Sequence, residues 1–174
     1  MVETGDADAF ITGLYTKYSN TIKVAKDVIG IREENSTFGT MHIINSPKGI
    51  LYLADTLVNS DPNTDDLVDI ANLAARTVSF FNETPNIAMI SYSNFGSDTA
   101  PGSLKVKNAV KTLHENNPDI CIDGEMQIGY ALNKELRDQK YPFSKLAGKE
   151  VNTLVFPNLT SARSAFKLLQ MLSN

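Results

Sequence analysis

The residues that could do chemistry lie in four short polar segments. Residues 93–97, Ser-Asn-Phe-Gly-Ser, bring hydroxyls and small amides together between a buried apolar run at 87–92 and a helical pattern that resumes near Ser103. A strand followed by a small polar loop and a helix can bind an anion through backbone N–H groups at the helix start. A plain connecting loop fits the same residues, because every α/β domain contains several such turns.

A pair of carboxylates forms the second segment. Asp123 and Glu125 flank Gly124, and side chains two residues apart lie on the same side of an extended strand end. Paired carboxylates can perform acid–base chemistry or hold a metal. Alternatively, Asp123 caps a turn with Gly124, and Glu125 is a solvated charge at the end of a strand.

The remaining two segments are residues 55–56, Asp-Thr, and residues 158–161, Asn-Leu-Thr-Ser. Ligands of open parallel sheets bind beyond the carboxyl ends of the strands, so all four segments are candidates for one site. The two histidines, His42 and His114, are far apart in sequence and indicate neither a histidine metal site nor a catalytic triad. The sequence also has no glycine-rich nucleotide-binding motif.

Hydrophobic periodicity indicates the elements that must position these segments. From residue 63 onward helical and strand patterns alternate, which favours a mostly parallel sheet sandwiched by helices. Strands at 39–45 and 50–56, joined by Ser-Pro-Lys-Gly, predict an antiparallel hairpin extension. The other predicted elements are strands at 8–12, 87–92, 119–126 and 151–156, and helices at 20–31, 64–81, 104–116, 127–136 and 160–172.

Local signals predict the ends of two helices. Ser19 is a good N-cap for the helix at 20–31, and Gly30 helps to end that helix. The helix at 64–81 can be capped by Thr64 or Asn63.

Composition restricts the classes of function. The 174 residues suffice for one domain, and the formal net charge of −4 with scattered Lys and Arg argues against nucleic acid and anionic membranes as partners. No apolar run approaches the ~20 residues of a membrane helix. Cys121, the single cysteine, lies between two isoleucines and is expected to be a buried strand thiol. One cysteine excludes an internal disulfide and fits a reducing compartment, so we expect a cytoplasmic protein.

Five segments resemble, in matching order, the signatures of the phosphate acetyl/butyryl transferase family. They are residues 7–13, 54–59, 91–97, 118–127 and 154–159. The variants Ser-Tyr-Ser-Asn-Phe-Gly-Ser and Asp-Gly-Glu-Met-Gln resemble most the domain appended to NADP-dependent hybrid malic enzymes. The resemblance implies an isocitrate/isopropylmalate dehydrogenase-like, phosphotransacetylase-type fold. It further implies a single domain over residues 1–174, incomplete at both ends relative to the family, with the central subdomain and a little of its neighbour.

The resemblance also implies a function and a ligand site. We expect a regulatory and oligomerisation module of an NADP-dependent, oxaloacetate-decarboxylating malic enzyme, with acetyl-CoA as ligand. No cofactor or metal is expected in these residues, since NADP and a divalent metal would belong to the malic enzyme part. No catalytic residue is assigned. The residues implied to line the inherited cleft for acetyl-CoA or phosphate are Lys23, Asp55, Ser93, Asn94, Gly96, Ser97, Asp123, Glu125 and Asn158.

Departures from the family pattern argue against catalysis. A further acid of the family corresponds here to Gly129 or Tyr130, two glycine and amide positions to Ala162 and Arg163, and an arginine to Lys23. Lysine keeps the charge of arginine but lacks its planar fork. The family's Ser-Arg-Gly segment, to which transition-state stabilisation and CoA binding are assigned, would lie beyond the last residue.

Two alternatives stay open. The first is an active phosphate acetyltransferase that moves acetyl between CoA and phosphate, with Arg163 or Lys145 as a substitute donor. The second is a ligand-free dimerisation piece that self-associates through the apolar hairpin at 39–56. The inner face of that hairpin could instead simply pack on the helix at 64–81.

Overall fold

The computed structural model describes residues 2, 4–9, 11, 17–31, 35–46 and 49–172. They divide into two compact units, Met1–Ser36 and Thr37–Asn174. Among these residues, no helix has the length and apolar character needed to cross a membrane.

The first unit contains helix α1 (Tyr18–Val28), none of whose residues is buried. The predicted cap is wrong: Ser19 lies inside the helix, and Lys17 takes the N-cap position without a side-chain cap bond. Gly30 follows the helix with φ +80°, the left-handed geometry that ends helices, as predicted. The strand predicted at 8–12 is not confirmed, because residues 8, 9 and 11 are not in a strand, whereas residues 10 and 12 lie outside the described residues.

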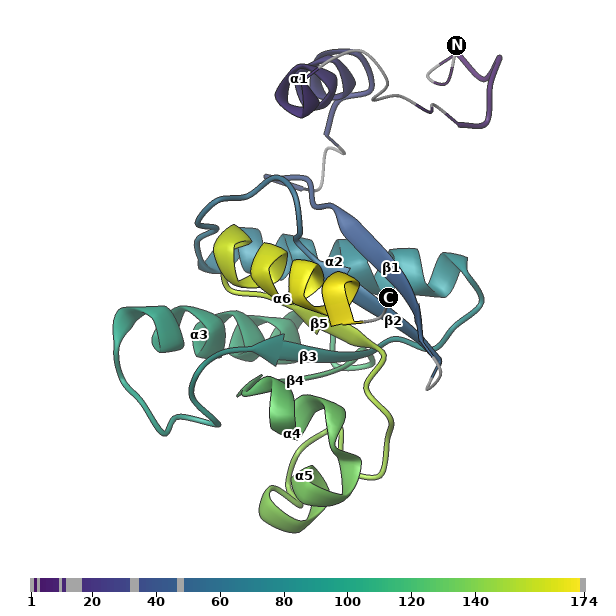
Figure 1. Cartoon of the computed structure of the whole chain (residues 1–174). Coiled ribbons are helices and arrows are strands. Elements are labelled where there is room, and N and C mark those ends of the chain that lie inside the picture. Colours follow the sequence, from purple (N-terminus) through teal and green to yellow (C-terminus); the bar gives the residue numbers. More distant parts are fainter. Residues whose placement is uncertain are drawn as a thin grey trace. The chain divides into compact units, whose positions relative to one another are not determined.

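The second unit is built on a five-stranded sheet with the order β1-β2-β5-β3-β4 (Figure 1). β1 pairs antiparallel with β2, and all other neighbours pair in parallel. The strands are β1 (Met41–Ser46), β2 (Gly49–Ala54), β3 (Asn86–Ile90), β4 (Cys121–Met126) and β5 (Thr153–Val155). The predicted hairpin and the mostly parallel sheet are therefore confirmed.

Five helices of this unit connect or follow the strands. They are α2 (Thr64–Phe80), α3 (Pro101–Asn116), α4 (Ile128–Leu132), α5 (Lys134–Lys140) and α6 (Leu159–Leu172). Asn63 and Asp66 form a reciprocal capping box at the start of α2. The single helix predicted at 127–136 is wrong. The side chain of Asn133 accepts a hydrogen bond from the N–H of Leu136, and this cap starts α5 separately from α4.

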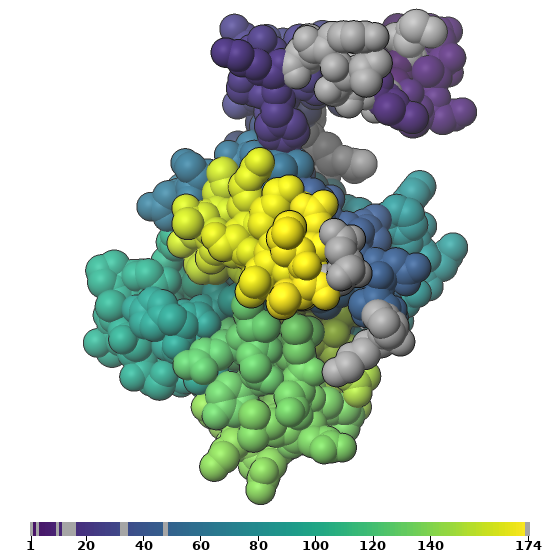
Figure 2. Space-filling model, in the orientation of Figure 1, coloured from purple at the N-terminus to yellow at the C-terminus, as the bar shows by residue number. Residues whose placement is uncertain are grey.

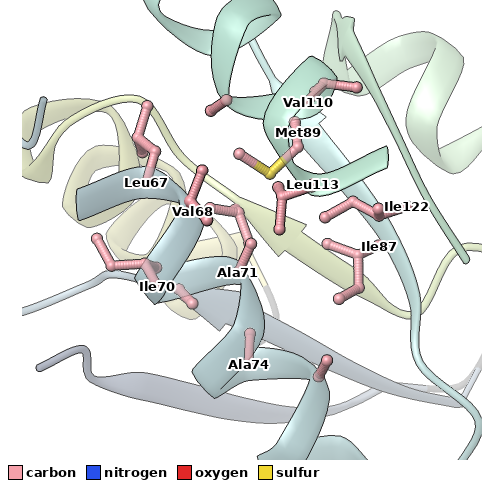
Figure 3. Close-up of a cluster of buried hydrophobic side chains, with 14 of the residues drawn as sticks. Leu67, Val68, Ile70, Ala71, Ala74, Ile87, Met89, Val110, Leu113 and Ile122 are labelled. Atoms are coloured by element: carbon pink, nitrogen blue, oxygen red, sulfur yellow. The ribbon is translucent and has the colours of Figure 1, made fainter. Parts of the chain in front are cut away.

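Two hydrophobic clusters hold the helices on opposite faces of the sheet. Ile87 and Met89 of β3 pack with α2 and α3, as Figure 3 shows for most of this cluster. Ala88 and Ile90 point to the other face, where they pack with residues of α4 and α6. Complete burial of an Ile or Met side chain contributes about 1.5–3 kcal/mol to the free energy of folding. Because side chains alternate along β3, residues of this strand stabilise the packing on both faces of the sheet. The predicted α/β sandwich is confirmed.

Candidate functional site

Three of the polar segments follow the carboxyl ends of β2, β3 and β5, whereas Asp123 and Glu125 lie within β4 near its carboxyl end. These four strands run parallel. β3 leads to α3, whereas the neighbouring β5 leads to α6 on the opposite face of the sheet. Ligands of open α/β sheets bind where the chain leaves adjacent strands toward opposite faces. The loop at 93–97, which follows β3, is therefore the centre of the candidate site.

This loop has a specific backbone conformation. Phe95 and Gly96 both have positive φ, +46° and +85°. The N–H of Asn94 donates to the Ser97 hydroxyl at 2.9 Å, and the N–H of Ser97 donates back to the carbonyl of Asn94 at 3.0 Å. These bonds close residues 94–97 into a tight turn.

A β-bulge in β4 brings a carboxylate to the loop. Met89 of β3 pairs with Gly124, but the next residue, Ile90, pairs with Met126, so Glu125 has no partner in β3. Glu125 is fully buried, and its Oε1 accepts hydrogen bonds from the N–H of Gly96 at 2.5 Å and the hydroxyl of Ser93 at 3.3 Å. The carboxylate thereby binds the loop from inside the protein.

Three buried serines continue this network. The Ser93 hydroxyl lies 3.1 Å from that of Ser91 and 2.8 Å from that of Ser103, which donates to the carbonyl of Asp98 at 3.0 Å. Sequence reasoning missed Ser91 and Ser103, because hydroxyls on a strand and a helix carry no local signal of a shared network. Ser93 is thus a scaffold residue of the loop in this structure.

All five backbone N–H groups of residues 93–97 have acceptors within the chain. Those of Asn94, Gly96 and Ser97 donate to the Ser97 hydroxyl, the Glu125 carboxylate and the Asn94 carbonyl. That of Ser93 donates to the Ser91 hydroxyl at 3.4 Å, and that of Phe95 donates to the carbonyl of Glu125 at 2.8 Å. An external anion at this loop would have to replace some of these bonds. Glu125 already accepts hydrogen bonds from the N–H of Gly96 and the hydroxyl of Ser93.

Asp123 serves a different segment from Glu125. Its Oδ2 accepts from the Ser144 hydroxyl at 2.7 Å and from the N–H of Lys145 at 2.8 Å, and its Oδ1 lies 3.8 Å from His114 Nε2. Spacing alone suggested that both carboxylates face the same way. The bulge at Glu125 breaks the alternation of the strand, and the two carboxylates bind separate segments.

Asp55 is a buried acceptor at the end of β2. Its two carboxylate oxygens accept hydrogen bonds from the N–H and hydroxyl of Thr40, the N–H of Leu57, and the N–H and side-chain amide of Asn59. These bonds fix the loop after β2 and join it to the residues before β1. In this structure Asp55 positions a loop.

The last two predicted residues lie at the start of α6 and in α1. Asn158 is the N-cap of α6, and its side-chain oxygen accepts from the N–H of Ser161 at 2.9 Å. Lys23 is an exposed residue of α1 in the first unit.

An aromatic cluster packs against the loop. The ring of Phe95 lies 4.7 Å from that of Tyr141 and 5.1 Å from that of Phe143, and Tyr130 lies 5.0 Å from Tyr141. Burial and the neighbouring Tyr130 raise the pKa of Tyr141. The cluster connects the loop at 93–97 with the segment that Asp123 holds.

Arg137 stabilises the segment from α4 to Lys149, and sequence reasoning missed this role. Its guanidinium is fully buried and donates to the carbonyls of Tyr130, Ala131, Leu146 and Lys149. A single arginine in a polar helix carries no signal of burial, because most such residues are solvated.

Two further side chains bear on the site's chemistry. A Cβ placed on Gly96 would lie 2.9 Å from the amino group of Lys107, so this lysine, which sequence reasoning missed, lies directly against the loop.

Cys121 is only partly buried, because β4 is an edge strand, and this corrects the expectation of a buried thiol. Its sulfur accepts a hydrogen bond from Lys149 Nζ at 3.0 Å. The described residues contain no cluster of three or more His, Cys, Asp or Glu that could hold a metal ion.

Comparison with known proteins identifies relatives along the whole chain. Residues 1–174 match the family described as phosphate acetyl/butaryl transferase. The NADP-dependent malic enzyme of Escherichia coli is 39% identical over 174 residues, which cover 100% of this chain and 23% of the relative. The phosphate acetyltransferase of Treponema pallidum is 35% identical over 184 residues, with 100% of this chain and 54% of the relative covered.

A solved structure shows the same fold. The phosphotransacetylase from Streptococcus pyogenes superposes with a TM-score of 0.91 at 33% identity, covering 99% of this chain and 53% of that chain. The chain therefore spans only part of the length of its relatives, about half of this structure and 23% of the malic enzyme.

Proposed function

The chain belongs to the phosphate acetyl/butyryl transferase family, and from this membership we propose that it is a regulatory and oligomerisation module of an NADP-dependent malic enzyme. Both of its units belong to one phosphotransacetylase-like domain that binds acetyl-CoA. NADP and a divalent metal act in the malic enzyme part of the cytoplasmic parent protein. Support comes from the identity of 39% to such an enzyme over the full 174 residues.

The observation that carries the regulatory role is the hydrogen bonding of the loop at 93–97. Acyl transfer requires donors aimed at the oxyanion that develops in the transition state. Here the N–H of Gly96 and the hydroxyl of Ser93 are bound to the buried Glu125 carboxylate. A loop whose donors are already used is suited to hold a ligand by its outer surface rather than to stabilise a reacting centre.

The proposed ligand contacts divide by exposure. Asp55, Ser93, Asp123 and Glu125 are buried and shape the site. Asn94, Gly96, Ser97, Asn158 and Lys23 are at least partly exposed and contact acetyl-CoA. In this arrangement acetyl-CoA biases the malic enzyme by binding more tightly to one assembly state than to another.

Calorimetric titration of the 174-residue chain with acetyl-CoA tests the ligand. We expect saturable binding, weakened about tenfold in Lys23→Gln by loss of one charged contact. Lys26→Gln is the matched control, because Lys26 is exposed on the same helix and has no proposed role. Absence of binding at millimolar acetyl-CoA would remove acetyl-CoA from the proposal.

The second candidate, an active phosphate acetyltransferase, is favoured by the TM-score of 0.91 to a phosphotransacetylase. A coupled assay for acetyl phosphate formed from acetyl-CoA and phosphate by the full-length protein separates the two. The regulatory proposal expects no turnover above background. Clear turnover would establish the transferase instead.

Self-association is proposed through the hairpin of β1 and β2. Ile43 is 48% exposed and Ile50 is 42% exposed on this pair, and β1 is an edge strand of the sheet. Sedimentation should show a dimer that Ile43→Lys weakens, whereas Leu168→Lys on α6, also exposed, leaves it intact. A strict monomer at high concentration would exclude this interface.

A further inference from the structure

Two basic side chains contact the partly buried ring of Phe166 on α6, and a third, Arg163, lies one helical turn before Phe166 and Lys167. His42 of β1 stacks on Phe166 with ring centroids 3.8 Å apart, and Lys167 Nζ lies 5.4 Å from the centroid of the same ring. Arg163 precedes Lys167 by one helical turn, and both charges act on His42. We call His42, Arg163 and Lys167 the basic cluster. Figure 2 shows α6, in yellow, at the molecular surface.

The basic cluster has no carboxylate to balance it among residues 35–46 and 49–172. Arg163 is exposed and has neither a hydrogen bond nor an ion pair with any residue of these two ranges. Lys167 donates only to the neutral Gln170, at 2.8 Å. The sequence of α6 contains no acidic residue. Like charges one helical turn apart repel each other. Burial lowers the pKa of His42, and the nearby positive charges of Arg163 and Lys167 lower it further.

The cluster also lies at the carboxyl ends of the parallel strands, where ligands of open α/β sheets bind. His42 Nδ1 lies 2.7 Å from the hydroxyl of Thr56, which directly follows Asp55 at the end of β2. Arg163 lies in the second turn of α6, whose cap is Asn158 after β5. The cluster is thus separate from the loop at 93–97, but both lie at the carboxyl ends of the parallel strands.

We propose that the basic cluster binds the phosphate group of an anionic ligand, with the Arg163 guanidinium making the principal contact. Guanidinium and phosphate match in geometry and form paired, charge-assisted hydrogen bonds. The inference deepens the proposed function and rests on it for the identity of the ligand. It assigns the phosphate end of the ligand to α6, whereas the loop at 93–97 keeps its donors on Glu125.

Nuclear magnetic resonance titration of the His42 ring tests the cluster directly. The probes are inorganic phosphate and adenosine 3′,5′-bisphosphate, with sodium chloride at matched ionic strength as the blank. Bound phosphate raises the pKa of His42, because it opposes the charges of Arg163 and Lys167. Tighter binding of the bisphosphate than of inorganic phosphate identifies the nucleotide end of CoA as the source; equal binding identifies free phosphate.

Variants make the test specific. Arg163→Gln should raise the pKa of His42 without ligand and weaken the bisphosphate about tenfold, the effect of losing one charged contact. Lys111→Gln removes an exposed charge on α3 and should change neither quantity. A chemical shift of His42 that phosphate does not alter, or alters equally in Arg163→Gln, would overturn the inference.

The inference and the proposed function fail separately. If acetyl-CoA binds Arg163→Gln as tightly as the unmodified chain, the basic cluster is not the phosphate subsite and the proposed function stands. If the bisphosphate binds in an Arg163-dependent manner but acetyl-CoA does not bind, the cluster stands and the proposed function is wrong.

Discussion

The Oε1 atom of Glu125 accepts a hydrogen bond from the N–H of Gly96 at 2.5 Å, across 29 residues of sequence. The contact joins the end of β4 to the loop after β3. It exists because the bulge releases Glu125 from the ladder and turns it toward the loop. The loop is therefore closed by an acidic side chain of the protein itself.

Glu125→Gln should loosen the loop at 93–97. An amide can keep one acceptor, but its NH₂ group would take the place of Oε2, which has no partner among the described residues. An unsatisfied buried donor costs about 1–3 kcal/mol, so the free energy of unfolding should fall by about 2 kcal/mol. Hydrogen exchange at the Gly96 amide should accelerate more than at Ile87. Glu115→Gln, at an exposed glutamate of α3, serves as control, and unchanged exchange at Gly96 would contradict the role of Glu125.

Gly124→Ala should be strongly destabilising. The φ of Gly124 is +150°, and a Cβ there would lie 2.6 Å from the carbonyl oxygen of Met89, a backbone atom that cannot move aside. We expect a loss of about 3 kcal/mol in chemical denaturation, within the range for strain combined with overpacking. The matched substitution Gly129→Ala lies in α4 with open space around it, and should gain about 0.5–1 kcal/mol from helix propensity. Similar effects at both glycines would refute this account.

Arg137→Met should destabilise the region from α4 to residue 149. Removal of the guanidinium takes this donor from the carbonyls of Tyr130, Ala131 and Lys149, whereas the carbonyl of Leu146 keeps the N–H of Lys149. An unsatisfied buried group costs about 1–3 kcal/mol. We expect a loss of about 3 kcal/mol and faster proteolysis between residues 141 and 149. Lys140→Met, at an exposed lysine of α5, should change stability by no more than about 0.5 kcal/mol. Equal protease resistance in the two variants would show that Arg137 is dispensable.

His42 should make the protein less stable in mild acid. Its pKa in the folded state is lowered below 6.5, so protonation is less favourable in the folded chain than in the unfolded one. The stability that His42 contributes is complete above pH 6.5 and declines as the pH falls from there toward the folded-state pKa. Urea denaturation between pH 7.5 and 5 should show a smaller decline for His42→Gln than for the unmodified chain. Equal slopes would disprove a lowered pKa.

Most of the fold could be predicted because its signals are local. The apolar run at 87–90, the proline and glycine of the hairpin turn, and the Asn63 cap of α2 each specify their element from neighbouring residues. The break between α4 and α5 was missed because Asn133 also fits the interior of a polar helix. Its capping bond to Leu136 decides the outcome.

The candidate site was less predictable because its bonds are distant in sequence. Ile122 and Met126, an even number of residues apart, should share a face of a regular strand, yet they belong to opposite hydrophobic clusters. The glycine between two acids was the available sign of a bulge. The partner of Glu125 could not be read from spacing, since Gly96 belongs to another strand's loop.

The strand order has a consequence for how the chain reaches its native state. β5 is the last strand in the sequence but lies between β2 and β3, which have no pairing with each other in the described sheet. Until residues 153–155 are available, the chain can form only two separate pairs, β1 with β2 and β3 with β4. During synthesis, both pairs would therefore wait for β5 with an exposed inner edge, and such edges are prone to aggregation. We expect a slow, late step in folding at which β5 inserts, because pairing this distant in sequence carries a large loop-closure entropy.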